Sequence, residues 1–305
     1  MSLTLSQRFS YNDAEGRRIC SSSRLPLIYD YGKETHLKSH IAIIRNFLNY
    51  LLHHDVCPEY QDQINGARAV CDLADKELWK ARQASCALPG DFNIACSTLF
   101  GGHYQGLYAG DQEWAKGMDL TTGMSDETAW RTFKFGLAAV GDNQAQRFAE
   151  LAKTSSNKVT KERSVGLEIT KIIYADEETR CFYKEQVPDL GVLGKIRGRE
   201  WKCPYLPDED LTEEEQAATP PIPEEYEFWV EEGVLDVCFV GMKMEGMVRD
   251  LSCGVQYIDQ ILGIYATFYT FLANERMIGW KAPVLIDHSK EEENAEADGG
   301  DEAMD

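Results

Sequence analysis

Residues 37–60, LKSHIAIIRNFLNYLLHHDVCPEY, decide the fold of the N-terminal half of the chain. Their apolar positions recur at steps of three and four, which places one continuous stripe on a helix of about four turns. Pro58 predicts that this helix ends near His54, because the residue before a proline is pushed out of the α region, whereas proline itself suits the first turn of a following helix. The stripe of the first helix consists of Leu37, Ile41, Ile44, Leu48 and Leu51.

Two further helices follow in the sequence. The second begins at Pro58 and its stripe holds mostly small residues, so the first two helices are predicted to lie close together as an antiparallel pair. The third follows Leu88-Pro89-Gly90, with Asp91 as the residue whose side chain caps the free amides and Gly101-Gly102 as the C-terminal stop. The stripe of the second helix consists of Tyr60, Ile64, Ala67, Cys71, Ala74, Leu78 and Ala81.

The next part of the chain predicts a loop, a helix and a connector. Four glycines and several aromatic residues within residues 101–114 indicate a loop packed by its own side chains, and their spacing does not fit a phosphate-binding loop. A helix is predicted to follow, with Ser125 or Asp126 as its cap and an interruption at Gly141. Residues 153–163 are interpreted as a polar connector.

Strand-like patterns begin after this connector. Residues 165–173 alternate apolar and polar side chains, which predicts a strand. The acidic run 176–178 predicts a turn into a partner strand through Phe182, and residues 195–207 predict another strand that ends in a proline-bounded loop. A β-hairpin is therefore expected at the start of the C-terminal half.

The rest of the C-terminal half combines strand and helix predictions. Residues 227–230 and 234–248 are interpreted as β-like segments in which glycines introduce bulges or a break. Residues 255–272 have apolar positions at helical spacing, although their β-branched and aromatic content also suits a strand. A helix is predicted there, because the apolar stretch exceeds ordinary strand length.

These patterns predict an α+β fold, with a helical N-terminal half (an antiparallel helical hairpin plus further helices) and a mixed, mainly antiparallel β-containing C-terminal half. Residues 208–225 contain eight acidic residues, three prolines and no basic residue, which favours a solvated acidic loop. The expected divisions are an arm over residues 1–36, a single domain over 37–286 (helical part 37–152, β-rich part 164–286, acidic loop 208–225) and a disordered acidic tail over 287–305.

The composition limits the classes of function. The chain has 305 residues, and a hydrophobic content of 43% is enough for a substantial core. Its 51 acidic and 31 basic residues give a formal net charge of -20, which argues against a large basic face for bare nucleic acid or for anionic membrane. The nine cysteines include no Cys-x-x-Cys pair, so neither a zinc site nor a disulfide framework is indicated. An intracellular protein without metal or cofactor is expected.

The sequence offers few candidates for catalysis. His53-His54-Asp55 places imidazoles beside a carboxylate, but neighbouring helix residues point about 100 degrees apart and no further spaced ligand completes a site. Because histidines at a helix C-terminus complement its dipole, a capping role is favoured. Cys57 has no activating neighbour and is expected to be buried. His103 and Asp111 belong to the glycine-rich stretch 101–114, which has no G-x-S-x-G motif, so catalytic residues are not assigned.

One basic group is a candidate for nucleic-acid contact. Lys195, Arg197, Arg199 and Lys202 alternate on a predicted strand near Trp201, a combination that meets phosphate and stacks bases in other proteins. Alternation alone predicts a solvated sheet face. That interpretation is favoured, because four charges in so acidic a chain form only a local patch.

Three stretches of the chain are similar to one known family. FLNYLLHHDVCPEY (47–60), LPGDFNIACSTLFGG (88–102) and FLANERMIGWKAPVLI (271–286) resemble the Argonaute-binding subunit of the fungal Argonaute siRNA chaperone complex. The resemblance implies a non-catalytic subunit that, with a second subunit, binds Argonaute carrying duplex small RNA and restrains passenger-strand release in RNA-interference-directed heterochromatin silencing. It also implies contact with small RNA only through Argonaute, and a location in the nucleus and cytoplasm. No site residue of the family is transferred to this chain.

Two alternatives come from other classes of protein. One is an intracellular hydrolase that uses His103 or His54 at the glycine-rich loop, residues 101–110. A base within about 3 Å of a hydroxyl or thiol in a pocket would favour it. The other is an adaptor unrelated to RNA.

Overall fold

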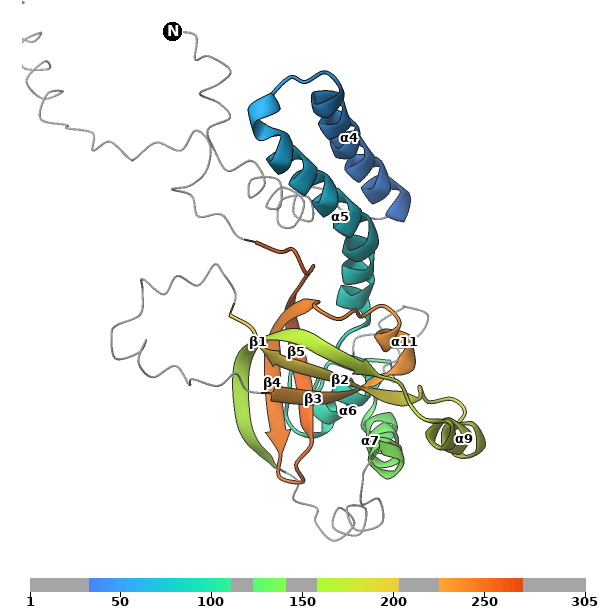
Figure 1. Cartoon of the computed structure of the whole chain (residues 1–305). Helices are drawn as coiled ribbons and strands as arrows, with labels where there is room; N and C mark the ends of the chain where they lie inside the picture. The colour runs from blue at the N-terminus through green and yellow to red at the C-terminus, as the bar shows by residue number, and fades with distance from the viewer. Residues whose placement is uncertain (1–32, 111–122, 141–157, 203–224, 271–305) are drawn as a thin grey trace, which may run out of the picture. The chain divides into compact units, whose positions relative to one another are not determined.

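The computed structural model describes residues 33–110, 123–140, 158–202 and 225–270, all of which belong to one compact unit. The predicted α+β class is confirmed, since the N-terminal half is helical and the C-terminal half contains a five-stranded antiparallel sheet (Figure 1). In chain order the elements are α4 (Glu34–His53), η2 (Pro58–Tyr60), α5 (Gln61–Ala87), α6 (Asp91–Leu99), α7 (Asp126–Val140), β1 (Val159–Ile173), α9 (Glu177–Gln186), β2 (Leu193–Glu200), β3 (Glu225–Glu231), α11 (Glu232–Leu235), β4 (Lys243–Leu251) and β5 (Gln256–Tyr265).

The predicted helical hairpin is confirmed. α4 ends at His53, and Pro58 opens the single 3-10 turn η2 that leads into α5. Small residues on α5 let the helices approach closely, since Ala67 and Ala74 are almost completely buried. The same core includes Ala266 and Phe268, which follow β5, so the chain returns to the hairpin after the sheet.

The C-terminal end of α6 also follows the prediction. Gly101 adopts a left-handed φ of +81°, which glycine tolerates without a steric penalty. The Gly102 amide then donates to the Ser97 carbonyl oxygen at 2.8 Å, the bond that closes a Schellman motif. The predicted cap at the other end is wrong, because Gly90 is the N-cap residue and Asp91 already lies within the helix.

α7 begins as predicted. Ser125 Oγ accepts a hydrogen bond from the Thr128 amide at 3.2 Å, and Phe133 and Leu137 are buried. The expected interruption at Gly141 lies outside the described residues. So do residues 153–157 of the predicted connector and Asp111.

Three of the expected divisions also fall largely outside the described residues. They are the arm up to residue 32, residues 208–224 of the acidic loop, and the acidic tail 287–305. The predicted boundaries of these segments therefore stay predictions.

The rest of the predicted connector is wrong, because β1 begins at Val159. Residues 159–168 of β1 pair with β4, and Arg163 Nη2 lies 2.8 Å from Asp250 Oδ2. Charged side chains on the outer face of a strand satisfy each other across strands. A strand of this kind therefore looks like a connector when only hydrophobicity is read.

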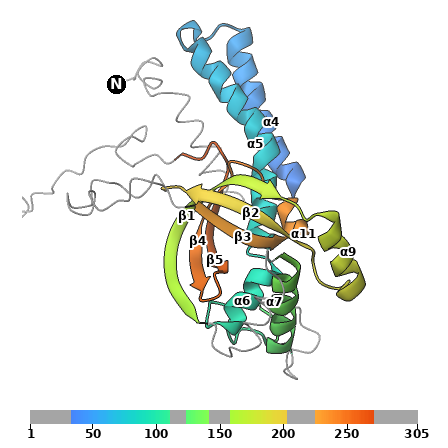
Figure 2. The ribbon, with the colours of Figure 1, turned by 60° about the horizontal axis from the view of Figure 1, so that its bottom comes forward.

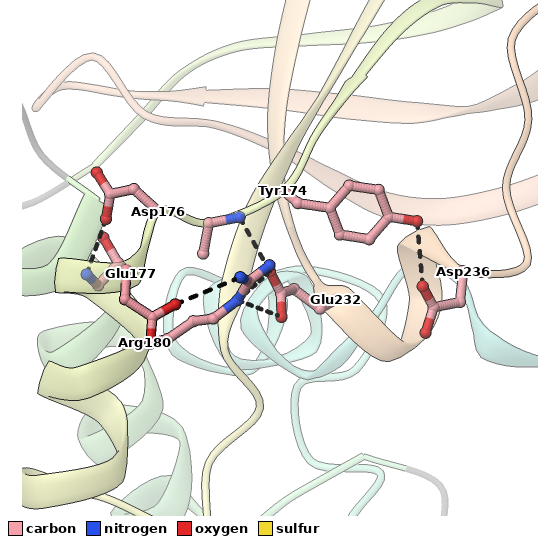
Figure 3. A network of polar contacts seen from close by, with 8 residues as sticks. Tyr174, Asp176, Glu177, Arg180, Glu232 and Asp236 are labelled. Carbon is pink, nitrogen blue, oxygen red and sulfur yellow. Dashed lines mark hydrogen bonds and ion pairs between the residues drawn. The ribbon is translucent and has the colours of Figure 1, made fainter.

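The predicted hairpin after β1 is also wrong, because residues 177–186 form helix α9. Asp176 caps it, accepting from the Thr179 amide at 2.8 Å. Figure 3 shows Arg180 of α9 facing Glu232 of α11, with Nη2 2.9 Å from Oε1. Tyr174 OH donates to Asp236 Oδ1 nearby. The strand that pairs with the end of β1 is β2. β2 overlaps the first part of the strand predicted at residues 195–207.

Two corrections apply near the C-terminal end of the sheet. The start of the predicted β-like segment 234–248 is wrong, because residues 232–235 form the short helix α11. The expected bulge within that segment is confirmed by a register shift between Glu245 and Gly246. The helix predicted over residues 255–272 is wrong, because β5 occupies residues 256–265. The pairing with β4 skips Asp259 and Leu262, so two irregularities break the period of two and mimic helical spacing.

The sheet has the strand order β3-β2-β1-β4-β5, with every neighbouring pair antiparallel. β1 is shared along its length, since residues 159–168 pair with β4 and residues 167–173 pair with β2. This stagger accompanies the curvature of β1 seen in Figure 2. The sheet edges β3 and β5 approach each other, and the Glu227 amide of β3 donates to Gln256 Oε1 of β5 at 3.4 Å. No helix in the described part of the chain is long and apolar enough to cross a bilayer.

The hairpin seam gives a direct test of this packing. Ala67→Phe should lower the free energy of unfolding by about 1 to 3 kcal/mol, because a ring overpacks the space between α4 and α5. Urea unfolding measures the change. Ala69→Phe is the matched control: Ala69 is exposed on the same helix, and its replacement should change stability by less than about 0.5 kcal/mol. Equal midpoints for the two variants would mean that the buried face of α5 has been assigned wrongly.

Candidate functional site

The stretch LPGDFNIACSTLFGG (88–102) forms α6 and its ends, and it places polar side chains between the two edge strands of the sheet. Asn93 and Ser97 lie one helical turn apart and are fully buried. Phe92 and Cys96, on the same helix, pack with Phe133 of α7 in an apolar cluster that also includes Trp229 of β3 and Tyr257 of β5. α6 is thus held by β3 and β5 through both apolar and polar contacts.

Asn93 connects the two edges directly. Its Oδ1 accepts from the Ile258 amide of β5 at 2.9 Å, and its Nδ2 donates to the Trp229 carbonyl oxygen of β3 at 2.9 Å. Nδ2 also donates to the Pro89 carbonyl oxygen at 2.8 Å. One buried carboxamide therefore satisfies backbone groups that the last strands of an open sheet leave without a strand partner.

Glu231 of β3 supplies the cap that Asp91 was expected to give. The Phe92 amide, in the first turn of α6, donates to Glu231 Oε1 at 2.6 Å. Burial raises the pKa of Glu231 to about 7, against partial stabilisation of the charged form by the backbone bonds. Among the described residues, Glu231 Oε2 has no hydrogen-bond partner. One carboxyl oxygen of Glu231 thus caps α6, whereas the other is buried without a hydrogen bond to the described residues.

Asp259 of β5 fixes the other end of α6 and the start of the glycine-rich loop. Ser97 Oγ donates to Asp259 Oδ1 at 2.5 Å, and the His103 amide donates to the same oxygen at 3.0 Å. The Tyr104 amide donates to Ser97 Oγ at 3.0 Å. Any side chain at Gly102 would collide with Ser97 and Asp259, so glycine is required for this close approach.

Arg249 of β4 completes this cluster. Its Nη1 donates to the Gly101 carbonyl oxygen at 2.8 Å, and its Nη2 lies 3.1 Å from Glu162 Oε2 of β1. Arg249 Nε forms an ion pair with Asp259 Oδ2 at 3.2 Å without hydrogen-bond geometry. The buried carboxylate of Asp259 therefore has a cationic neighbour, as a buried charge requires.

The hydrolase hypothesis depends on a cavity beside the glycine-rich loop. The cavity has a volume of about 330 Å³ and is lined by Ser85, Leu88, His103, Tyr104 and residues 260–264. Ser85 Oγ donates to the Arg82 carbonyl oxygen, and the His103 ring packs edge-on against the Tyr104 ring at 5.0 Å. Across the described residues, no hydroxyl or thiol is hydrogen-bonded to the His103 ring. Among the described lining residues, the base and the hydroxyl groups are therefore not joined by the contact that would favour the hydrolase.

The histidine pair lies where a capping role requires it. His53 is the last residue of α4, and the His54 amide donates to the Tyr50 carbonyl oxygen at 3.1 Å. The His54 ring lies 4.4 Å from the Tyr50 ring, and no group of three or more potential metal ligands occurs in the part of the chain that is described. The expected burial of Cys57 is wrong in degree, because this residue is half-buried.

Three of the basic residues on β2 have carboxylate partners on neighbouring strands. Lys195 Nζ lies 3.0 Å from Glu227 Oε1, and Arg197 Nε lies 2.8 Å from Glu227 Oε2. Arg199 Nη2 lies 2.8 Å from Glu168 Oε2. Lys202 follows the strand, and Trp201 packs near Tyr265 with ring centroids 5.7 Å apart. This arrangement fits a solvated sheet face better than an open phosphate site.

Five residues of the site were missed from the sequence: Asn93, Ser97, Glu231, Arg249 and Asp259. A usable signal exists for the first two, because polar residues four positions apart sit within the otherwise apolar face of a short helix. No local signal marks Glu231 or Asp259. Their partners on α6 lie 139 and 162 residues away in the sequence.

The raised pKa of Glu231 predicts the direction in which the stability of the protein changes with pH. Between about pH 4.5 and pH 7 the folded state binds more protons at this group than the unfolded state, so its contribution to stability falls as pH rises. The loss approaches about 3 kcal/mol across that window. Glu231→Gln keeps an acceptor for the Phe92 amide and should remove this slope. Chemical unfolding from pH 4.5 to 7.5 measures it.

The control for this experiment is Glu225→Gln, on the exposed start of β3, which should keep the wild-type slope. If Glu231→Gln and wild type lose stability in parallel over the window, Glu231 does not titrate as described.

Comparisons with known proteins place the chain in a family. The family model described as Argonaute siRNA chaperone (ARC) complex subunit Arb1 matches residues 21–283. Argonaute-binding protein 1 of Schizosaccharomyces pombe (strain 972 / ATCC 24843) is 34% identical over 84 residues, which are 27% of this chain and 21% of that protein. No solved structure matches. Because the family model covers most of its length, the chain belongs to the Arb1 family of Argonaute siRNA chaperone complex subunits.

Proposed function

We propose that this chain is a non-catalytic subunit of an Argonaute siRNA chaperone complex that binds Argonaute carrying duplex small RNA. The observation that carries the proposal is the family match over residues 21–283. The name of the fission yeast relative, an Argonaute-binding protein, points to the same partner. A second subunit of the complex is part of the proposal, as is a location in the nucleus and cytoplasm.

The polar side chains of α6 have structural partners within the chain. The buried polar side chains of this helix hold backbone or side-chain groups of β3, β5 and the glycine-rich loop. A catalytic group must instead face a space that a substrate enters. The buried polar residues of α6 therefore have a structural role, because they hold the helix against the sheet.

The charge distribution supports contact with RNA through Argonaute alone. A net charge of -20 repels bare phosphate, and Lys195, Arg197 and Arg199 of β2 are paired with Glu168 and Glu227. A protein partner with a basic nucleic-acid channel would, in contrast, attract this chain.

The proposed activity is a difference in affinity. A subunit restrains passenger-strand release if it binds Argonaute with duplex RNA more tightly than Argonaute with a single guide strand, because it then stabilises the earlier state. Silencing of heterochromatin directed by RNA interference would be the downstream consequence.

A release assay tests this proposal. Purified Argonaute is loaded with a duplex whose passenger strand is labelled, and the release rate is measured with and without the full chain. We expect a stoichiometric complex and release slowed at least about tenfold, which corresponds to about 1.4 kcal/mol on the activation free energy of release. The chain should not bind the bare duplex at the same concentration.

A variant with Arg197→Ala and Arg199→Ala serves as the control for direct RNA contact. It should slow release as well as wild type does, because both guanidinium groups face carboxylates of the chain itself. Absence of a complex between wild type and loaded Argonaute would refute the proposed partner. An unchanged release rate within a stable complex would refute the restraining role.

A further inference from the structure

α4 carries a second stripe of side chains that does not face α5. The spacing between its members is four, three, four, three and four residues, the pattern by which one helix packs along another. Ile43, Phe47 and Tyr50 at its centre are 66%, 52% and 56% exposed. The whole stripe consists of His36, His40, Ile43, Phe47, Tyr50 and His54.

From Ser39 onward, the exposed side of α4 is free of formal charge when its histidines are neutral. Between Ser39 and His53 the sequence contains one charged residue, Arg45, although 27% of the chain is charged. Arg45 belongs to the other side of the helix, where its Nη2 lies 2.8 Å from Asp72 Oδ1 of α5 and 3.3 Å from the Cys71 carbonyl oxygen. Depletion of charge together with exposed aromatic residues is typical of the centre of a protein interface.

The residue types of the stripe are arranged symmetrically about position 45. Ile43 and Phe47 are equally distant from that position, as are His40 and Tyr50, and as are His36 and His54. An antiparallel copy of α4 with its two-fold axis near residue 45 would therefore place apolar against apolar, aromatic polar against aromatic polar, and histidine against histidine. A two-fold interface requires this kind of self-complementarity.

We propose that the chain forms a homodimer in which the outer faces of two α4 helices pack antiparallel, so that two helical hairpins make a four-helix bundle. Ile43 of each copy packs on Phe47 of the other, and His40 lies opposite Tyr50. Ala42, Asn46 and Asn49 beside the stripe are small or uncharged, which lets the helices approach. The inference goes beyond the proposed function and does not depend on it.

The chemistry of the face favours a second copy over a different protein. The acidic remainder of the chain favours a basic partner, but such a partner would need carboxylates on this face, and residues 39–53 contain none. An uncharged face is where two molecules of charge -20 meet with the least repulsion between their interface side chains.

Sedimentation equilibrium of the full chain tests the proposal from about 1 µM to about 100 µM, where micromolar association is resolved. The weight-average mass should rise from 34.5 kDa towards twice that value. Phe47→Glu and Ile43→Lys should each raise the dissociation constant at least about 100-fold, because each places two unpaired charges in the apolar centre. Circular dichroism checks that both variants keep the fold, which is expected because both positions are exposed.

A mixture of the two variants tests the antiparallel register. In the mixed dimer, the lysine introduced by Ile43→Lys faces the glutamate introduced by Phe47→Glu, while the second contact keeps its native Phe47 and Ile43. Mixing should therefore restore association to within about tenfold of wild type. Leu262→Glu, at a position that is 57% exposed on β5, is the matched control and should dimerise normally.

Three results would overturn the proposal. They are a wild-type chain that stays monomeric over the whole range, a Phe47→Glu variant that dimerises as tightly as wild type, and a mixture of variants that stays monomeric. A monomeric wild type whose binding to Argonaute is lost on Phe47→Glu would show that this face serves a different protein.

Discussion

The side chain of Asn93 is bonded to both edges of the sheet, and much of the architecture depends on this bridge. β3 and β5 are the last strands of a five-stranded sheet, so some of their backbone groups have no neighbouring strand. Exposed strand edges invite pairing with other chains. Asn93 gives the Trp229 carbonyl oxygen and the Ile258 amide a partner from a helix, which covers the gap instead of adding a sixth strand.

Two carboxylates hold the ends of the same helix, α6. Glu231 accepts from the first turn of the helix, and Asp259 holds Ser97 near its end together with the His103 amide. The two carboxylates come from opposite edges of the sheet, so α6 keeps its place only while both edges stay close. Ala84 and Leu88, at the end of α5, are buried in the core of the sheet, which connects the helical hairpin to the same arrangement.

The sequence predicted those features of the fold that depend on residues close together in the chain. The stripes of α4 and α5, the Gly101 stop and the Ser125 cap all follow from residues within a few positions of each other. The cap at Asp176 was available in the same way, since Thr179 lies three residues later, but the acidic run was interpreted as a turn. β5 was missed because irregularities at Asp259 and Leu262 disturb the alternation of a strand. The candidate site was less predictable, because its contacts join distant segments: nothing near Glu231 indicates that it caps a helix 139 residues earlier, and nothing near Asp259 indicates Ser97.

Native-state hydrogen exchange at the Ile258 amide tests the central bridge most directly. This amide belongs to the outermost strand and donates to Asn93, so its protection reports whether α6 closes the sheet. The account predicts that it exchanges with the same opening free energy as the amides of β4 in the middle of the sheet. Rapid exchange at Ile258 while the amides of β4 stay protected would contradict the bridge.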